Sequence, residues 1–255
     1  MCYDIKTSLN AQLKKAKREN NPSIIAEIEE KMAPMTDLPL FHSSGFDHPK
    51  LFIYTTQSPN IPIIANWGLV PDWINGEKQK NDIWNSTLNA RGESIFEKPS
   101  FKDAAKNGRC IIYIDGFYEH HYRSGQRIPH LIFNKNKEPL AIAGLWNEWK
   151  NEQKGLVINT FSIVTSPANK LLSEIHNNPK IESARMPLIL SEADESVWLN
   201  PKIEEKETIN SLIKASPDGE LEAYTVRKLK GKSYLGNVEK TTERFEYAEM
   251  HTLFD

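Results

Sequence analysis

The sequence predicts an α+β fold, with a single domain over residues 1–255 built on a curved, barrel-like and mostly antiparallel sheet with peripheral helices. Eight segments rich in β-branched or aromatic residues follow one another from residue 51 onward. Several are joined by turns of hairpin length, which favours antiparallel pairing. Helical segments interrupt these strands without alternating regularly with them, which is atypical of parallel α/β proteins.

The boundaries of the expected elements follow from composition and turn residues. Strands are expected at 51–56, 61–70, 110–123, 128–135, 139–150, 156–165, 186–190 and 221–229. Helices are expected at 9–20, 22–32, 100–107, 166–176, 191–199 and 203–215. Asn21 before Pro22 reads as an N-cap followed by a proline at the first helical position.

The composition is that of an ordinary globular protein, with 39% hydrophobic and 26% charged residues. The net charge of -2 leaves room for a local basic groove and therefore for a polyanionic partner. No signal-peptide or membrane-length apolar run is present, which predicts a cytoplasmic protein without membrane contact. The two cysteines do not have the spacing of metal ligands, and no nucleotide-binding glycine pattern is present. We therefore expect neither a metal nor a cofactor. No obligate protein partner is evident.

The residue after the initiator methionine carries the most distinctive chemistry. Removal of Met1, which small following residues permit, would leave Cys2 with a free α-amine and a thiol on neighbouring carbons. This aminothiol can condense with an aldehyde and close a thiazolidine ring, or its thiol alone can attack a carbonyl. The unperturbed amine titrates near ~8, so part of it is uncharged at neutral pH. A disordered and unreactive chain start is the alternative.

Two further segments suit contacts with nucleic acid. Trp67 and Trp73 flank a proline turn in the segment WGLVPDW, where they form either core or a surface on which nucleobases stack. Asn89 and Arg91 place an amide beside a guanidinium, a pair that suits a phosphate, although a solvated loop has the same composition.

Two other segments suit proton transfer. Glu119 follows two aromatic residues, and partial desolvation there would raise its pKa towards neutrality. His176 ends an expected helix, where it can act as acid or base. An exposed strand end is the alternative for Glu119. The apolar surroundings of Cys110 predict a buried and inert thiol.

The order of these segments resembles the SOS response-associated peptidase (SRAP) family. Cys2, WGLVPDW, NARGE, RCIIYIDGFYE, TSPAN and RMPLIL follow one another over residues 2–190. The resemblance implies a sensor of abasic sites in single-stranded DNA that forms a thiazolidine crosslink in the DNA damage response. It also implies possible lyase and autopeptidase activities. Cys2 would be the nucleophile, and Asn89, Glu119 and His176 would position and protonate the reacting groups.

DNA contacts are expected from cationic and aromatic residues. The resemblance implies a phosphate contact for Arg91, and Arg185 and the basic residues of 98–127, including Arg109, are further candidates for the charge of the groove. Trp67 and Trp73 are expected to border that groove.

Three departures from the family pattern concern the site. Asp4 stands where the family has an arginine, His120 replaces a tryptophan, and residues 177–184 separate His176 from Arg185. Two other functions compete with the resemblance. One is an N-terminal-nucleophile thiol hydrolase or peptidase, which would need an oxyanion hole. The other is a non-catalytic nucleic-acid-binding module in which Cys2 is incidental.

Overall fold

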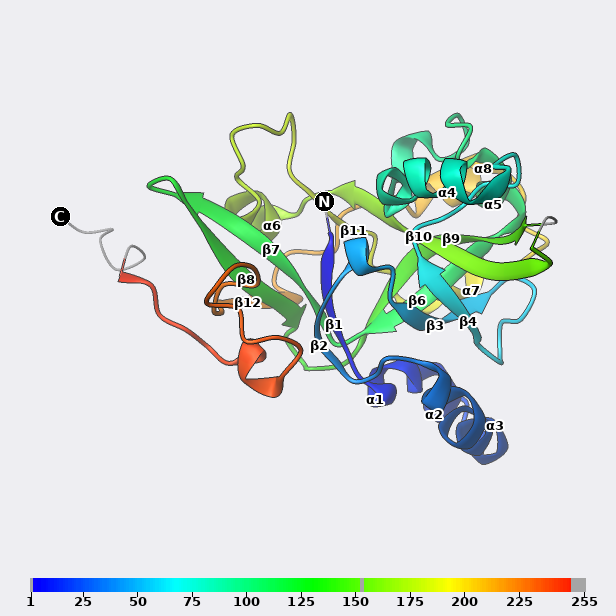
Figure 1. The fold of residues 1–255 in the computed structure, drawn as a ribbon, viewed down its shortest axis with the longest axis horizontal. Helices are drawn as coiled ribbons and strands as arrows, with labels where there is room; N and C mark the ends of the chain where they lie inside the picture. The colour runs from blue at the N-terminus through cyan, green and yellow to red at the C-terminus, as the bar shows by residue number, and fades with distance from the viewer. Residues whose placement is uncertain (1, 152–153, 249–255) are drawn as a thin grey trace.

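A computed structural model describes residues 2–151 and 154–248 and confirms the α+β class (Figure 1). Its core is a closed barrel of five strands in the hydrogen-bonded order β10-β4-β3-β6-β9, with β9 pairing back to β10. Every pair in the barrel is antiparallel except β10 with β4. The barrel strands are β3 (Lys50–Thr55), β4 (Ile63–Trp67), β6 (Arg109–Ile114), β9 (Leu140–Asn151) and β10 (Leu156–Pro167).

Two three-residue strands flank the end of β10 outside the barrel. β5 (Asn89–Arg91) continues the parallel edge beyond β4, and β11 (Arg185–Pro187) pairs antiparallel with the last residues of β10. Thr165 lies opposite Arg91 on one side and Pro187 on the other. The end of β10 therefore brings the NARGE and RMPLIL segments together.

A second sheet of five strands lies beside the barrel in the order β12-β8-β7-β1-β2. Only Asp115 separates β6 from β7, so the chain passes from the barrel into this sheet without a loop. β1 lies in the middle, with Asp4 opposite Tyr118 of β7 and Ser44 of β2. The strands are β1 (Asp4–Thr7), β2 (Leu40–Ser44), β7 (Gly116–Arg123), β8 (Gln126–Asn134) and β12 (Leu221–Thr225).

The run of apolar residues in β6 reflects burial on both faces. Cys110, Ile112 and Ile114 join the main core, whereas Ile111 and Tyr113 face a second cluster beneath the helices. Successive side chains of a strand point to opposite faces, so a strand covered on both sides has no polar alternation. The prediction of a buried Cys110 is confirmed.

Short helices surround the two sheets. They are α1 (Leu9–Gln12), α2 (Lys14–Arg18), α3 (Pro22–Glu27), α4 (Gly76–Trp84), α5 (Lys102–Asn107), α6 (Lys170–Ile175), α7 (Glu192–Trp198) and α8 (Lys206–Ser211). A π-helical turn (Ile28–Met32) follows α3, and 3-10 turns occupy Ala33–Met35, Gly45–Asp47, Asn85–Thr87, Gly92–Ser94 and Glu239–Thr242.

The N-caps account for the start of α3 and correct the expected starts of α5 and α6. Asn21 Oδ1 accepts a hydrogen bond from Ile24 N at 3.1 Å, as its position before Pro22 predicts. α5 begins at Lys102 without a side-chain cap, two residues after the expected start at Ser100. β10 extends through Pro167, and Asn169 rather than Ser166 caps α6.

The described residues contain neither a membrane-spanning helix nor a cluster of metal ligands. Within 2–151 and 154–248, no helix is long and apolar enough to cross a bilayer. The same residues contain no group of three or more His, Cys, Asp or Glu side chains suited to a metal ion.

Trp67 is part of the barrel core. Its side chain is fully buried, lies 6.2 Å from the Phe161 ring between centroids, and donates from Nε1 to Leu88 O at 2.8 Å. Trp73 lies in the turn after β4 and is 52% exposed. The two tryptophans of WGLVPDW therefore have different environments.

We expect the Trp67→Ala variant to lose about 3–5 kcal/mol of unfolding free energy, because truncation of a large core side chain leaves a cavity. The Trp73→Ala variant should change that free energy by less than about 0.5 kcal/mol. Denaturant titration of both variants provides the measurement. Similar losses in the two variants would contradict the core assignment of Trp67.

Candidate functional site

Cys2 lies two residues before the first residue of β1 and is buried, close enough to Glu119 for the charge of that carboxylate to act on its thiol. Only 1% of the residue is exposed, and its Sγ lies 3.9 Å from the carbonyl oxygen of Asp4, to which it donates. Burial raises the pKa of the Cys2 thiol well above its usual range, and the charges of Glu119 and Asp4 raise it further. The thiol is therefore protonated at neutral pH and needs a base to react.

Glu119 and His176 form a buried pair next to Cys2. Glu119 Oε2 lies 3.5 Å from His176 Nδ1, and Glu119 Oε1 accepts a hydrogen bond from His120 N at 2.9 Å. Both side chains are buried, one from β7 and the other from the C-terminal end of α6. A proton can pass between a carboxylate and an imidazole at this separation. General acid-base catalysis uses this arrangement.

The loop 177–184 leaves His176 beside Arg185. His176 Nδ1 lies 3.0 Å from Arg185 O, and Arg185 N points to the same ring nitrogen at 3.3 Å. Asn177 ties the loop to β7, because its Oδ1 accepts from Tyr122 N at 2.6 Å and its Nδ2 donates to Tyr122 O at 3.0 Å. The eight residues between His176 and Arg185 therefore bulge outward without moving the histidine from its expected neighbour.

A cavity of about 530 Å³ opens beside this pair. Its wall includes Tyr3 and Asp4, which directly follow Cys2, and both Glu119 and His176. Positive charge exceeds negative charge around it although the whole chain carries -2. Such local segregation attracts a polyanion. The lining cations are Arg91, Arg127, Lys180, Arg185 and Lys230, and the lining acids are Asp4, Glu119 and Glu182.

β5 places Asn89 and Arg91 on one face, because side chains two apart in a strand point the same way. Arg91 is exposed and lines the cavity. Both polar atoms of the Asn89 amide are buried without a hydrogen-bond partner among the described residues. An unsatisfied buried amide costs about 1–3 kcal/mol, so Asn89 is a strong candidate for a ligand contact.

Arg185 lies at the cavity wall with its guanidinium already engaged. Its terminal nitrogens contact the Glu93 carboxylate at 2.7 and 3.0 Å, and Nη2 also donates to Thr165 O at 2.8 Å. These contacts fasten β11 to the end of β10 and hold the backbone that contacts His176. We therefore regard Arg185 as support for the site, in place of the free phosphate contact that the sequence suggested.

Two sequence-based expectations for DNA contacts are wrong. The buried Trp67 side chain has no surface on which a base can stack. Arg109 is fully buried and donates to backbone carbonyls around α5 and after α7. Trp73 is exposed, but it is not among the residues that line the cavity beside Cys2. Its role in DNA binding stays a prediction.

The structure reveals an aromatic pair that the sequence did not single out. The rings of Tyr3 and Phe46 lie 5.1 Å apart between centroids and both residues line the cavity. Phe46 is 45% exposed, and Lys230 Nζ lies 5.5 Å from its ring centroid. A lone phenylalanine after Gly45 gives no sequence signal, because its exposure depends on how the 3-10 turn Gly45–Asp47 packs.

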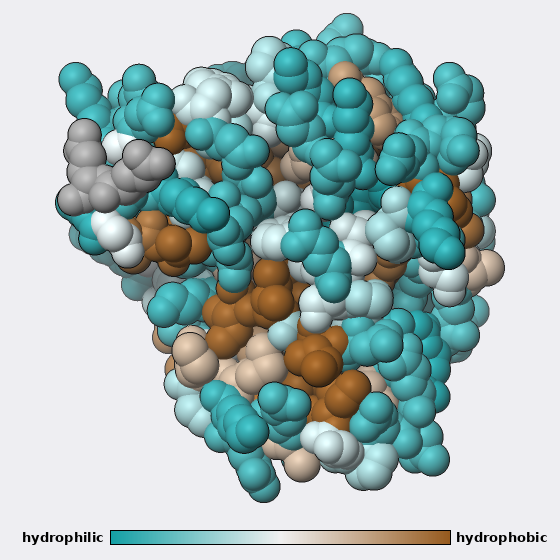
Figure 2. Space-filling view, turned by 90° about the vertical axis from the view of Figure 1, so that its right-hand side faces the viewer, coloured by the Kyte–Doolittle hydropathy of each residue, from teal (hydrophilic) through white to brown (hydrophobic). Residues whose placement is uncertain are grey.

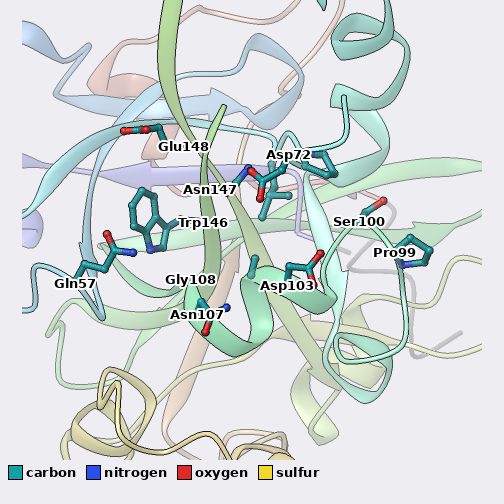
Figure 3. Close-up of a pocket in the computed structure, with 13 residues that line it drawn as sticks. Gln57, Asp72, Pro99, Ser100, Asp103, Asn107, Gly108, Trp146, Asn147 and Glu148 are labelled. Carbon is teal, nitrogen blue, oxygen red and sulfur yellow. The ribbon is translucent and has the colours of Figure 1, made fainter. Parts of the chain in front are cut away.

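Two other surface features fit a polyanion poorly. A cavity of about 260 Å³ between the turn after β4, α5 and β9 has Asp72, Asp103 and Glu148 as its charged residues (Figure 3). Asp72 Oδ1 accepts from Asn147 Nδ2 at 2.6 Å there, and no residue is shared with the cavity beside Cys2. On the face shown in Figure 2, apolar residues gather near the middle and in the lower part of the view, with hydrophilic residues around them.

Most of the chain, including the residues of this site, matches known proteins. The model of the family described as "SOS response associated peptidase (SRAP)" matches residues 1–233. The chain belongs to the SRAP family. This membership confirms the resemblance that the order of the sequence segments indicated.

Three similar proteins illustrate the SRAP relationship. The abasic site processing protein YoqW of Bacillus subtilis (strain 168) is 37% identical over 201 residues, covering 74% of this chain and 84% of that protein. The abasic site processing protein HMCES of Gallus gallus is 31% identical over 165 residues, covering 56% of this chain and 46% of that protein. A crystal structure of a Bacteroides thetaiotaomicron protein has a TM-score of 0.81 at 32% identity, covering 96% of this chain and all, 100%, of that one.

We expect the Glu119→Gln variant to alkylate Cys2 at lower pH than the unchanged protein. The Glu119 charge raises the pKa of the Cys2 thiol, so its removal increases the thiolate fraction at a given pH. Mass spectrometry of the Cys2 peptide after iodoacetamide treatment across a pH series provides the measurement. The Cys110 peptide is the internal control, and an unchanged Cys2 profile would place the Glu119 charge away from the thiol.

Proposed function

We propose that this SRAP protein captures abasic sites in single-stranded DNA as a thiazolidine crosslink through Cys2, after removal of Met1. Met1 lies outside the described residues. The observation that supports the proposal most is the buried Cys2 beside the Glu119–His176 pair, at a cavity with excess positive charge. A ring-opened abasic sugar is an aldehyde attached to a polyanion. The Cys2 aminothiol can react with the aldehyde, and the cationic side chains can bind the phosphates of the strand.

The proposed reaction begins at the amine. The α-amine of Cys2 attacks the aldehyde carbon, and the resulting carbinolamine loses water to give an imine. His176 donates the proton that leaves with the hydroxyl group. The Cys2 thiol then adds to the imine carbon, and Glu119 carries the thiol proton towards the imine nitrogen. The balance is one aldehyde and one aminothiol converted to a thiazolidine and one water.

The raised pKa of the thiol fits this order of steps. A thiol that is protonated at neutral pH attacks poorly by itself, whereas an amine can add first and create a more reactive imine. The thiol then needs a base only once, and Glu119 is the carboxylate whose charge acts most strongly on Cys2. This favours aldehyde capture over the thiol hydrolase, which depends on an activated thiolate.

The remaining site residues suit recognition of the DNA strand. Asn89 has an unsatisfied buried amide for a sugar or phosphate oxygen, and Arg91 has an exposed guanidinium on the same face of β5. Phe46 and Tyr3 offer a stacking surface for a neighbouring base, a contact worth about 1–3 kcal/mol. A purely DNA-binding module would leave the buried group of Cys2, Glu119 and His176 without a purpose.

Two further activities extend the proposal. Proton removal beside the imine carbon would start β-elimination at the abasic site. Attack of the Cys2 thiol on the Met1 carbonyl carbon would transfer the methionyl group to sulfur and free the Cys2 amine, and water would then hydrolyse this thioester and release Met1. Glu119 and His176 supply the proton transfers for both. If its target is chromosomal DNA, the protein acts in the cytoplasm and associates with the nucleoid when it is bound to DNA.

We expect the unchanged protein to form a heat-stable adduct with abasic single-stranded DNA and none with the intact strand. The Cys2→Ala variant should lose the adduct, because both the thiol and the ring closure depend on that residue. Denaturing electrophoresis and intact mass spectrometry provide the measurement, with Cys110→Ala as the matched control. The same adduct in the Cys2→Ala variant would exclude the thiazolidine mechanism.

We expect noncovalent binding to abasic-free single strands to weaken as salt rises, with a slope of about -0.7 per neutralised phosphate. The Arg91→Ala variant should flatten the logarithmic slope by about 0.7, which corresponds to one phosphate contact. Its reaction with a small free aldehyde should be unchanged. The Arg123→Ala variant is a matched control, since Arg123 does not line the cavity. Equal slopes for Arg91→Ala and the unchanged protein would remove Arg91 from the DNA interface.

A further inference from the structure

The chain after β12 reaches from one edge of the second sheet to the other. β12 and β2 are the two edge strands, and residues 226–248, here named the C-terminal strap, connect them (Figure 1). Asn237 Oδ1 accepts hydrogen bonds from Phe41 N at 2.7 Å and His42 N at 3.2 Å, while its Nδ2 donates to Pro39 O at 3.0 Å. The strap thus covers the free edge of β2.

The strap also contributes a phenol to a polar chain that leads to the site. Tyr234 Oη lies 2.6 Å from His42 Nδ1, and His42 Nε2 lies 3.0 Å from Asp4 Oδ1. His42 and Asp4 are buried. The SRAP family match ends at residue 233, so Tyr234 lies just beyond the part of the chain that the family describes.

The orientation of the His42 ring depends on its contacts with Tyr234 and Asp4. When its hydroxyl donates to His42 Nδ1, the neutral imidazole carries its proton on Nε2 and donates it to Asp4. Without the phenol, His42 Nδ1 loses the contact that fixes the plane of the ring, and the ring can turn so that Nε2 no longer points at the Asp4 carboxylate. The partner of one ring nitrogen thereby positions the other nitrogen. Asp4 would lose the donor that holds it.

Asp4 is close enough to Cys2 for its charge to matter there. Its carbonyl accepts from the Cys2 thiol, and its carboxylate charge is among the causes that raise the pKa of that thiol. Burial alone would raise the pKa of Asp4, but the hydrogen bond with His42, together with the charge of Lys230, outweighs burial and lowers it. The other titratable or charged groups around these two residues are Glu119, His120, Tyr118, Tyr234 and Lys230.

We infer that Tyr234 and His42 are positioning residues for the capture reaction, because they hold the Asp4 carboxylate on the imidazole and away from the α-amine of Cys2. The inference rests on the proposed function, since it concerns the amine that attacks the aldehyde. A carboxylate released from His42 would pair with the ammonium form of Cys2 and raise its pKa. The uncharged, nucleophilic amine would then be rarer at neutral pH.

The test is the pH dependence of crosslinking in the Tyr234→Phe variant at saturating abasic single-stranded DNA. From an amine pKa near ~8, a rise of about one unit lowers the rate at pH 7 about tenfold and at pH 9 less than about twofold. Tyr224→Phe is the matched control, because Tyr224 also fastens the strap, through a 2.8 Å hydrogen bond to Thr242 O, without touching His42. It should keep the unchanged profile.

The same substitution in an Asp4→Asn variant distinguishes an effect that acts through the Asp4 carboxylate from a general disturbance of the structure. In that background, Tyr234→Phe should no longer shift the profile, since no carboxylate remains to be released. A rate loss equal at all pH values, a shift that persists with Asp4→Asn, or an equal shift in Tyr224→Phe would overturn the inference. If the unchanged protein forms no adduct at all, the proposed function fails instead, so the two failures are distinguishable.

Discussion

The placement of β1 between β2 and β7 is the constraint on which the site depends. A chain start is ordinarily mobile, and a nucleophile there would sample many positions. Here pairing with two neighbouring strands fixes Asp4 and Ile5. Cys2 is only two residues away from Asp4, so its position is restricted as well. β7 supplies both the pairing partner of β1 and, one residue after Tyr118, the Glu119 carboxylate. One strand pairing therefore brings together the proposed nucleophile and the proposed base.

The end of β10 is a second constraint on the site. It positions the site residues that β1 and β7 do not carry. β5 and β11 pair with opposite sides of its last residues, which brings Asn89 and Arg91 near Arg185. Arg185 then links the two flanking strands through Glu93 and Thr165, and its backbone contacts His176. The imidazole is thus held by a short strand and the end of a helix, so the loop 177–184 can vary without displacing it.

The sequence predicted the barrel strands better than it predicted the short strands that surround the candidate site. Long apolar runs such as β6 carry their own signal, because burial on both faces removes polar residues. β1, β2 and β5 have three to five residues each and exist because neighbouring strands pair with them, which no local pattern encodes. For the same reason, the closeness of Cys2 to Glu119 could only be inferred from the resemblance to the SRAP family.

Aromatic and cationic residues show most clearly why local patterns mislead. Trp67 and Phe46 are both large and apolar, yet the smaller side chain is the one exposed at the cavity, because a β-strand points Trp67 inward and a 3-10 turn leaves Phe46 outside. Arg109 and Arg91 carry the same charge, but backbone carbonyls surround the first and the cavity surrounds the second. The positive charge that can bind a ligand at this site therefore comes from guanidinium groups that have no carboxylate or carbonyl partner within the fold. By that criterion Arg91 retains its charge for a ligand, whereas the charge of Arg185 is balanced by Glu93 before any DNA arrives.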